Sequence, residues 1–301
     1  KEVLSAKGEN YESQQKIVNK GLRMTEFSAS RRQLLQLLSP DDIEGIHNDS
    51  LAILEKVGVN VKNNEALRLL KDAGCEVDSD KKIARIPQHL VKNCLSKTQS
   101  LIRLYGRGGK HEQIVGRNNT IFNPGSSAVY FNDHETGEIR QPLSKDLVEL
   151  VKLVDALVYI QAQSTAMVPS EVQEEIGDLY RLYLVLKNST KPIVTGAFTK
   201  QGLIDMKHML EVVAGGEDKL AKEPMAIFDA CPSSPLMWSD TTCQNLIDCA
   251  RFNIPAEIIP APQMGATSPI TLAGTLVQFN AEFLSGMVIS QITKPSAPII
   301  Y

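Results

Sequence analysis

Apolar runs and amphipathic segments alternate along the second half of the chain. The strand-like apolar runs are residues 157–163, 192–198, 225–231, 255–260 and 297–301. Segments with helical spacing of apolar residues lie between them, at 171–188, 200–214, 240–252 and 271–291. This alternation indicates a parallel sheet covered by helices, and its repeat length is typical of a (β/α)8 barrel. Counting residues 120–123 or a neighbouring run as the first strand predicts six strands, two short of a closed barrel.

The first part of the chain has a different pattern. A Ser-Pro-Asp-Asp start and a stop at Gly58 predict one helix, and further helices are predicted at 63–73 and 87–96. Short alternating runs between residues 100 and 132 predict strands. We therefore expect an N-terminal helical arm at 1–36, an α+β cap at 37–115, and at 116–301 a (β/α)8 barrel domain that is truncated and continues in a longer protein. The alternative is an open doubly wound sheet that is complete at residue 301.

Composition limits the possible functions. The 301 residues are 43% hydrophobic and 22% charged, and a net charge of −3 without a basic stripe argues against nucleic acid as a partner. The five cysteines lack C-x-x-C spacing and the five histidines are scattered, so we expect neither disulfides nor a bound metal. Polar residues interrupt the most apolar helix, 271–291, which argues against a membrane span. With no signal-peptide pattern at the N-terminus, we expect a cytoplasmic protein.

Two acidic residues stand inside apolar strand-like runs. Asp229 lies in AIFDACPSS and Glu257 in IPAEIIPAP. A carboxylate buried in a sheet costs several kcal/mol unless it is paired or functional. In parallel α/β folds, ligands bind at the carboxyl ends of the strands. If both side chains point into the barrel they form a negative site that suits a cation, and we take both as catalytic candidates. The alternative is that each caps the strand end or forms a salt bridge there.

Other polar and aromatic residues near the predicted strand ends are candidates for substrate binding. A quaternary ammonium group could be held by an aromatic cage of Tyr105, Phe122, Phe198, Trp238 and Tyr301, although each ring alone is more typical of a core residue. Backbone N–H groups of residues 123–126 could bind an anion, or form a plain turn. The substrate-binding candidates are Phe122, Asn123, Gln163, Phe198, Gln263, Thr267 and Tyr301.

Three runs resemble a known family. They are LLSPDDIEGIHNDSLAILEKVGVNV, the segment around IFNPGSSAVYF, and GATSPITLAGTLVQFNAEFLSGMVISQ. Together they resemble the trimethylamine methyltransferase family of corrinoid-dependent enzymes. Since every residue is a standard one, the resemblance is to the branch without pyrrolysine, glycine betaine methyltransferase in particular.

The resemblance implies a methyltransferase that moves a methyl group from a quaternary amine to the Co(I) of a separate corrinoid protein. It implies a methylated amine as substrate, no tightly bound cofactor, and a partner that carries the cobalamin. We also expect a homo-oligomer that binds neither nucleic acid nor a membrane. Alternatives are trimethylamine or another methylated amine as substrate, a non-catalytic betaine-binding protein, or an unrelated barrel lyase. A lyase of the aldolase type would need a Schiff-base lysine at a strand end, and the sequence offers none well placed.

Overall fold

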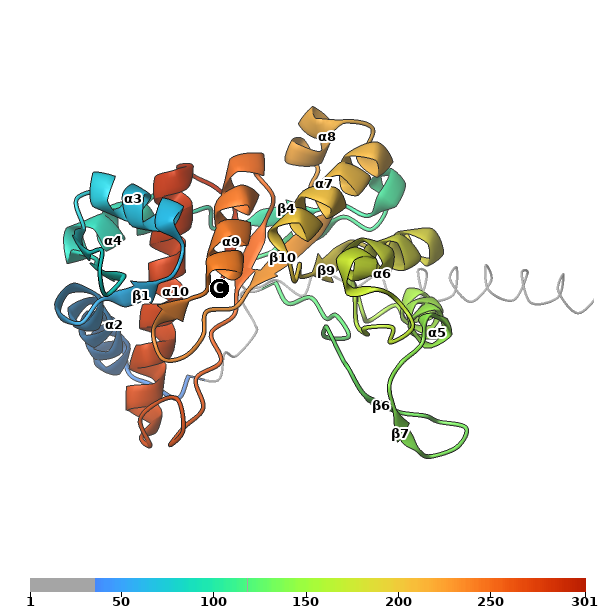
Figure 1. The fold of residues 1–301 in the computed structure, drawn as a ribbon, viewed down its shortest axis with the longest axis horizontal. Coiled ribbons are helices and arrows are strands. Elements are labelled where there is room, and N and C mark those ends of the chain that lie inside the picture. The colour runs from blue at the N-terminus through green and yellow to red at the C-terminus, as the bar shows by residue number, and fades with distance from the viewer. Residues whose placement is uncertain (1–35, 118) are drawn as a thin grey trace, which may run out of the picture. The chain divides into compact units, whose positions relative to one another are not determined.

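A computed structural model describes residues 36–117 and 119–301 of the chain. Residues 40–301 form one compact unit of mixed α/β structure (Figure 1). The preceding unit, 1–39, is described only at residues 36–39, which have no regular secondary structure. The predicted helical arm at 1–36 therefore lies almost entirely outside the described residues.

The first part of the compact unit is a group of helices around a small sheet. Its helices α2, α3 and α4 start and stop near the predicted residues. Asn63 accepts a hydrogen bond from the backbone N–H of Ala66 and so caps α3, while Gly58 follows α2 with a φ of +84° that glycine adopts easily. The elements are α2 (Pro40–Lys56), β1 (Val59–Val61), α3 (Asn64–Asp72), β2 (Glu76–Asp78), β3 (Ile83–Arg85) and α4 (Gln88–Leu95).

Two short hairpins follow, and then the main sheet begins. The first hairpin is β4 (Ile102–Leu104) and β5 (Gln113–Val115), with the 3-10 turn η2 (Arg107–Gly109) between them; the second is β6 (Phe131–Asn132) and β7 (Ile139–Arg140). The main sheet has five parallel strands in the order β13-β12-β10-β9-β8. They are β8 (Gln163–Ser164), β9 (Ile193–Thr195), β10 (Ala226–Ala230), β12 (Ala256–Ile258) and β13 (Ile299–Ile300).

Helices connect these strands and pack against one another in chain order. α5 contacts α6, α6 contacts α7, α7 contacts α9, and α9 contacts α10. Because strands and helices follow the same order, the sheet is wound in one direction only, with no point at which the strand order reverses. The helices are α5 (Ser144–Ala156), α6 (Glu174–Asn188), α7 (Lys200–Ala214), α8 (Glu217–Lys222), α9 (Asp240–Phe252) and α10 (Leu272–Thr293).

The prediction of a parallel sheet covered by helices is confirmed. The sheet is open along both edges, and residues 40–117 and 119–301 contain no closed barrel. The expected first strand at 120–123 is absent. In its place an irregular segment lies alongside β8. The Ala162 N–H donates to the Phe122 carbonyl, and Ala128 forms a parallel bridge with Met167. This segment extends the sheet without a regular strand.

The prediction of a strand at 157–163 was largely wrong. Only Gln163 and the following Ser164 are in β8, while Val158 and Tyr159 are 64% and 76% exposed in the turn after α5. That turn is held by Lys191, whose Nζ donates to the carbonyls of residues 154, 157 and 160. Apolar residues on an exposed turn thus gave the pattern of a buried strand.

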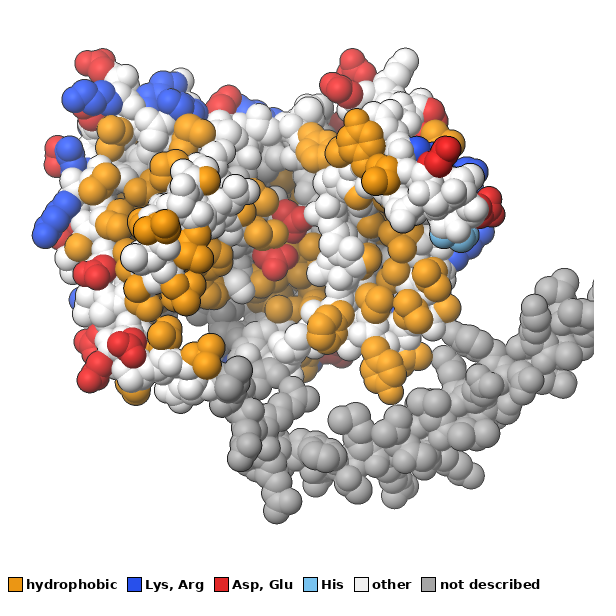
Figure 2. All heavy atoms as spheres, turned by 90° about the horizontal axis from the view of Figure 1, so that it is seen from below, with side chains coloured by type: hydrophobic (Ala, Val, Ile, Leu, Met, Phe, Trp, Pro, Cys, Tyr) orange, Lys and Arg blue, Asp and Glu red, His pale blue; other side chains and the backbone are white. Residues whose placement is uncertain are grey.

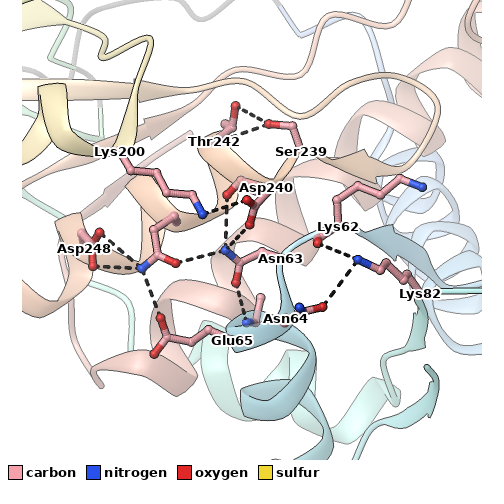
Figure 3. A network of polar contacts seen from close by, with 12 residues as sticks. Lys62, Asn63, Asn64, Glu65, Lys82, Lys200, Ser239, Asp240, Thr242 and Asp248 are labelled. Atoms are coloured by element: carbon pink, nitrogen blue, oxygen red, sulfur yellow. Dashed lines mark hydrogen bonds and ion pairs between the residues drawn. The ribbon is translucent and has the colours of Figure 1, made fainter. Parts of the chain in front are cut away.

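The first part of the chain is joined to the main sheet by a strand that the pattern did not predict. β11 (Met237–Trp238), in the loop after β10, pairs in parallel with β1. A polar network adds to this contact: Asn63 Nδ2 donates to Asp240 Oδ1 (2.9 Å) and Gln244 Oε1 (3.0 Å), and Lys200 Nζ reaches Asp240 Oδ2 (2.8 Å). Figure 3 shows Asn63 and Lys200 approaching Asp240 from different elements. Residues far apart in sequence therefore fix the start of α9.

The long helix α10 is a core helix of the compact unit. Contrary to the sequence-based expectation, it is long and apolar enough to cross a membrane by length and composition, the only such helix among the described residues. It contacts α2, α3 and α4 and also α9, and Figure 1 shows it standing between them. Its polar residues Gln278, Glu282 and Gln291 are buried and hydrogen-bonded within the protein. These contacts are those of a helix packed inside a protein.

Candidate active site

The two faces of the main sheet have different surroundings. Phe228 and Ile258 point to the large core shared with the helices, whereas Ile227 belongs to a small separate cluster. In this cluster Ala162, Val194 and Ile227 pack with Ile102 and Leu104 of β4. The β4–β5 hairpin therefore covers part of the face opposite the helices, which we call the inner face. Tyr105 at the end of β4 donates its N–H to the Pro224 carbonyl, just before β10, so the hairpin lies toward the amino ends of the strands.

Asp229 and Glu257 lie side by side on the inner face. They are direct partners in the register of β10 and β12, and Asp229 follows Ile227 by two positions, on the same side of the sheet. Both are at the carboxyl ends of their strands. The two acids that the sequence singled out are thus brought together as a pair on adjacent strands.

Burial raises the pKa of both acids, and the charge of Glu257 raises the pKa of Asp229 further. The pKa of Asp229 rises to about 7, first because the carboxyl group is buried and second because Glu257 is close; a hydrogen bond from Ser126 and the charge of Arg181 oppose this. Burial also raises the pKa of Glu257. Two carboxyl groups in one desolvated place resist simultaneous ionisation, so this pair can hold a proton near neutral pH.

Asp229 has unused capacity to accept hydrogen bonds. Ser126 Oγ donates to its Oδ2 at 3.2 Å, but its Oδ1 is buried and has no hydrogen-bond partner. No Lys, Arg or His of the described residues forms an ion pair with Asp229 or Glu257. A buried carboxylate oxygen without a donor costs stability, and a cationic ligand would relieve that cost.

Arg181 holds the backbone just after β8 and β9. Its side chain is fully buried and paired with Asp178 at 2.9 Å, and it donates to the carbonyls of Thr165 and Gly196 near the strand ends. Phe198 lies over the guanidinium carbon, 4.5 Å from the ring centroid, and is 55% exposed. Phe198 therefore lies next to the carboxyl end of β9, near the strand end at which the sequence analysis placed it.

Phe122 and Asn123 lie in the irregular segment beside β8. The Phe122 N–H donates to Gln161 Oε1, and its ring is 61% exposed. Asn123 Oδ1 accepts from the Gly125 N–H at 2.9 Å, so that this N–H serves the turn and is not free for an anion. The residue of this segment that contacts the acid pair is Ser126, through its hydroxyl group, which the sequence reasoning considered only for its backbone.

Two candidates point away from the acid pair. Gln163 is buried on the helix side, where its Nε2 donates to the Val151 carbonyl of α5 at 2.9 Å. Tyr301 packs edge-on against Phe283 of α10, with ring centroids 4.3 Å apart. Successive side chains of a strand alternate between faces, so being near a strand end did not place these two at the site.

Gln263 and Thr267 shape the loop after β12. The Gln263 N–H donates to Thr267 Oγ1, and the Gln263 carbonyl accepts three N–H groups of residues 266–268. The N-cap of α10 is Thr271. Both candidates lie at the same end of the sheet as Glu257, and their polar atoms hold the loop together.

The expected aromatic cage is not assembled. Trp238 is buried against α10, Tyr105 lies toward the amino ends of the strands, and Tyr301 faces α10. Phe122 and Phe198 remain as exposed rings beside strand ends. Cys231, two residues beyond Asp229, has an exposed surface, yet the protein atoms packed around it partly desolvate the thiol. This desolvation and the two acids raise its pKa. The sequence placed Cys231 at a strand end but gave no reason to choose it.

The surroundings of the acid pair differ from those of other polar clusters. A cavity of about 360 Å³ lies between the β6–β7 hairpin and α5, but its Arg140 is already paired with Asp133 and Asp146. Within the described ranges, no group of three His, Cys, Asp or Glu could hold a metal ion. Figure 2 shows a face on which acidic side chains lie in a hollow between two apolar areas.

The fold and the site together define a class of protein. The chain is a singly wound parallel α/β protein with an acidic, partly desolvated pair at the carboxyl ends of adjacent strands. The chain belongs to the trimethylamine methyltransferase (MTTB) family, whose sequence model matches residues 6–301. The resemblance found in the sequence is therefore confirmed.

Individual relatives agree with this assignment. The chain is 31% identical over 263 residues to a trimethylamine methyltransferase of Desulfitobacterium hafniense, covering 87% of this chain and 53% of the relative. It is 30% identical over 281 residues to a trimethylamine methyltransferase of Methanosarcina barkeri, covering 91% and 57%. It is 26% identical over 266 residues to a glycine betaine methyltransferase of Desulfitobacterium hafniense, covering 88% and 55%. The chain thus spans about half the length of these relatives.

Proposed function

We propose that this chain belongs to a methyltransferase that removes a methyl group from a quaternary amine, with glycine betaine as the favoured substrate. The observation that carries the proposal is the pair Asp229 and Glu257, two neighbouring carboxyl groups without a cationic side-chain partner among the described residues. A quaternary ammonium group is a permanent cation that cannot be deprotonated or donate a hydrogen bond. It needs negative charge and apolar contact, and the inner face offers both.

The chain's own residues would bind and orient the amine. Asp229 and Glu257 would neutralise its charge, while the exposed rings of Phe122 and Phe198 lie beside the neighbouring strand ends and could contact its methyl groups. The C–N bond breaks with its electron pair kept by nitrogen, so the leaving group is a neutral tertiary amine that needs no proton. The protein's contribution is therefore desolvation and alignment rather than acid–base catalysis.

We propose that the methyl acceptor is a corrinoid carried by a separate protein, with no cofactor bound tightly to this chain. When bound, a reduced corrinoid supplies a strong cobalt nucleophile. The acid pair would have to be reachable by such a large group, and the exposure of Cys231 beside Asp229 supports this. Asp229 would hold its proton at Oδ1 when the site is empty and release it when a cation binds.

We also propose that the complete protein has a (β/α)8 barrel, with 37–115 as its cap and 116–301 as part of the barrel. Support comes from the parallel sheet whose strand order equals the chain order, because helices wound on one face leave the other face to close on itself. A doubly wound sheet would show a reversal of strand order. Assembly as a homo-oligomer is part of the same proposal.

Other functions have less support. Trimethylamine is the alternative substrate, favoured by the names of the relatives that are 30–31% identical. A lyase with a Schiff-base lysine is disfavoured because Lys191, the buried lysine before β9, donates to three backbone carbonyls. A betaine-binding protein without catalysis would show ligand affinity but no transfer.

Two measurements test the proposal. Calorimetry should show that glycine betaine binds to this chain, and that Asp229→Asn and Glu257→Gln each weaken binding, while a Gln163→Ala change on the opposite face leaves it unaltered. The visible spectrum of a reduced corrinoid protein should change when this chain and glycine betaine are added together. Binding that is equal in the acid variants and the wild type would refute the assignment of the site. If the spectrum changes with trimethylamine but not with glycine betaine, the substrate is trimethylamine instead.

A further inference from the structure

Two buried polar residues of α10 form a chain of hydrogen bonds inside an otherwise apolar helix. Glu282 is fully buried, and its Oε1 accepts from the Leu236 N–H and from Gln278 Nε2, both at 2.9 Å. Its Oε2 accepts from Ser234 Oγ at 2.8 Å. Each carboxylate oxygen thus has a donor, which buried charge requires.

The same chain of bonds reaches a second loop. Gln278 Nε2 also donates to the carbonyl of Thr267 at 2.8 Å. Ser234 and Leu236 lie in the loop after β10, and Thr267 lies in the loop after β12. These two strands carry Asp229 and Glu257. One pair of side chains on α10 therefore links the two loops that follow the two acids.

The loop after β10 has further contacts with α10. Trp238 Nε1 donates to Ser285 Oγ at 2.9 Å. The Trp238 ring lies so close to Gly286 that a Cβ there would be 2.5 Å from Cζ2. Only four residues separate Asp229 from Ser234, so the chain between acid and anchor has little freedom.

We propose that Gln278 and Glu282 are positioning residues, which fix the two loops relative to each other and thereby set the opening around Asp229 and Glu257. The role in ligand binding rests on the proposed function of the acid pair. The anchoring of the loops can be tested without it. The contacts require acceptors rather than negative charge, because both backbone and side-chain donors reach Oε1 and a hydroxyl group reaches Oε2.

This argument separates two substitutions at one position. Glu282→Gln keeps an acceptor oxygen for Leu236 and Gln278, and the Ser234 hydroxyl can rotate to accept from the new amide N–H. Glu282→Ala removes all three contacts. Gln291→Ala is a matched control on the same helix: Gln291 is equally buried and holds Ser296 and Ala297 in the loop before β13, at the opposite end of the sheet.

The chain contains two natural reporters of the surroundings of the acid pair. Cys231 is its one exposed cysteine, because Cys75, Cys94, Cys243 and Cys249 are buried. Trp238 is its single tryptophan and is fully buried in the anchored loop. The rate of Cys231 labelling by an aromatic disulfide reports access to the acid pair, and the emission maximum of Trp238 reports the anchor. Neither measurement needs a ligand.

The experiment compares the wild type with Glu282→Ala, Glu282→Gln and Gln291→Ala, all as the full chain of 301 residues. We expect Glu282→Ala to label several-fold faster at Cys231, to shift Trp238 emission to longer wavelength, and to bind glycine betaine about tenfold more weakly. Glu282→Gln should match the wild type in all three. Gln291→Ala should lose stability in urea but keep the wild-type labelling rate, emission and affinity. Gln278→Ala, which frees Thr267 but leaves Ser234 and Leu236 held, should weaken binding while keeping the emission maximum.

Three results would overturn the proposal. The first is wild-type labelling and affinity in both Glu282→Ala and Gln278→Ala; the second is equal losses in Gln291→Ala, which would make the effect one of general stability. The third is a defect in Glu282→Gln as large as that in Glu282→Ala, which would make charge the cause. If Glu282→Ala does not fold, Gln278→Ala and Glu282→Gln still test whether the two loops are anchored through Gln278 and Glu282. If the wild type binds no glycine betaine, the proposed function fails, whereas Cys231 labelling and Trp238 emission still test the anchoring.

Discussion

Replacing Asp229 by Asn tests whether the acid pair is maintained at a cost in stability. The pKa of Asp229 is raised from 3.8 to about 7, so the folded protein holds this proton more tightly than the unfolded chain does. The resulting stabilisation is complete below pH 3.8 and is lost as the pH rises through about 7. At higher pH the folded protein must carry a charged, incompletely hydrogen-bonded carboxylate.

The size of the effect follows from the pKa. One pKa unit corresponds to about 1.4 kcal/mol, so the change from 3.8 to about 7 corresponds to about 4 kcal/mol at full strength. Asp229 is partly exposed, and water screens part of this cost, so we expect Asp229→Asn to be more stable than the wild type by about 2 kcal/mol at pH 8. Near pH 4 the wild-type side chain is protonated and resembles Asn, so the two proteins should be almost equally stable.

Urea unfolding at a series of pH values from about 2 to 8 measures this difference and that of the control. Asp133→Asn is the control of opposite sign, because hydrogen bonds from Arg140 and from the backbone lower the pKa of Asp133 to about 2. That variant should lose stability at neutral pH and approach the wild type as the pH falls from 3.8 toward 2. A stability difference for Asp229→Asn that stays constant from pH 4 to 8 would show that the folded and unfolded states bind this proton alike, and the reasoning about the acid pair would be wrong.

Three further predictions follow from other contacts. Binding of tetramethylammonium, measured by calorimetry, should strengthen as the pH rises through about 7, because a cation favours the charged form of Asp229. In Asp229→Asn the affinity should depend less on pH. The same pH profile in both proteins would contradict this prediction. Gly286→Ala should cost about 1–3 kcal/mol in urea unfolding, because its Cβ would be 2.5 Å from Trp238, and an unaltered midpoint would show that the ring can move away freely. Asn63→Ala should cost about 2 kcal/mol, because it removes the cap of α3 and the donor to Asp240 Oδ1, whereas the exposed Asn64→Ala should be nearly neutral.

The helices were predictable because their boundaries are set locally. α7 and α9 match the predicted residues 200–214 and 240–252 at both ends. Thr199 and Ser239 cap their first turns, and Gly215 and Asn253 end them in left-handed conformations. Each of these signals lies within a few residues of the boundary that it sets.

The short strands were less predictable because their partners are distant. β11 exists because Trp238 pairs with Val61, and nothing local in a two-residue strand indicates such a partner. The run 157–163 shows the opposite error, since its apolar residues lie on a turn held by Lys191 from the next segment. In both cases a contact that is remote in sequence decides the conformation.

The site was predictable as a place but not as a set of side chains. Asp229 and Glu257 were found because charge inside an apolar strand is unusual. Gln163 was chosen because it lies near a predicted strand end, yet its side chain faces the helices. A change of one position along a strand reverses the face to which a side chain points. Without the register of the sheet, the choice between the two faces could not be made.

Asp229 and Glu282 show how hydrogen-bond donors separate a site from its support. Both are acids in apolar surroundings. Glu282 is fully buried, and donors reach both of its oxygens, from Ser234, Leu236 and Gln278. Asp229 keeps a buried Oδ1 without a donor and a pKa near 7. Donors within the protein therefore satisfy both oxygens of Glu282, whereas Asp229 Oδ1 can still accept a partner. We therefore propose that Glu282 supports the site and that Asp229 belongs to it.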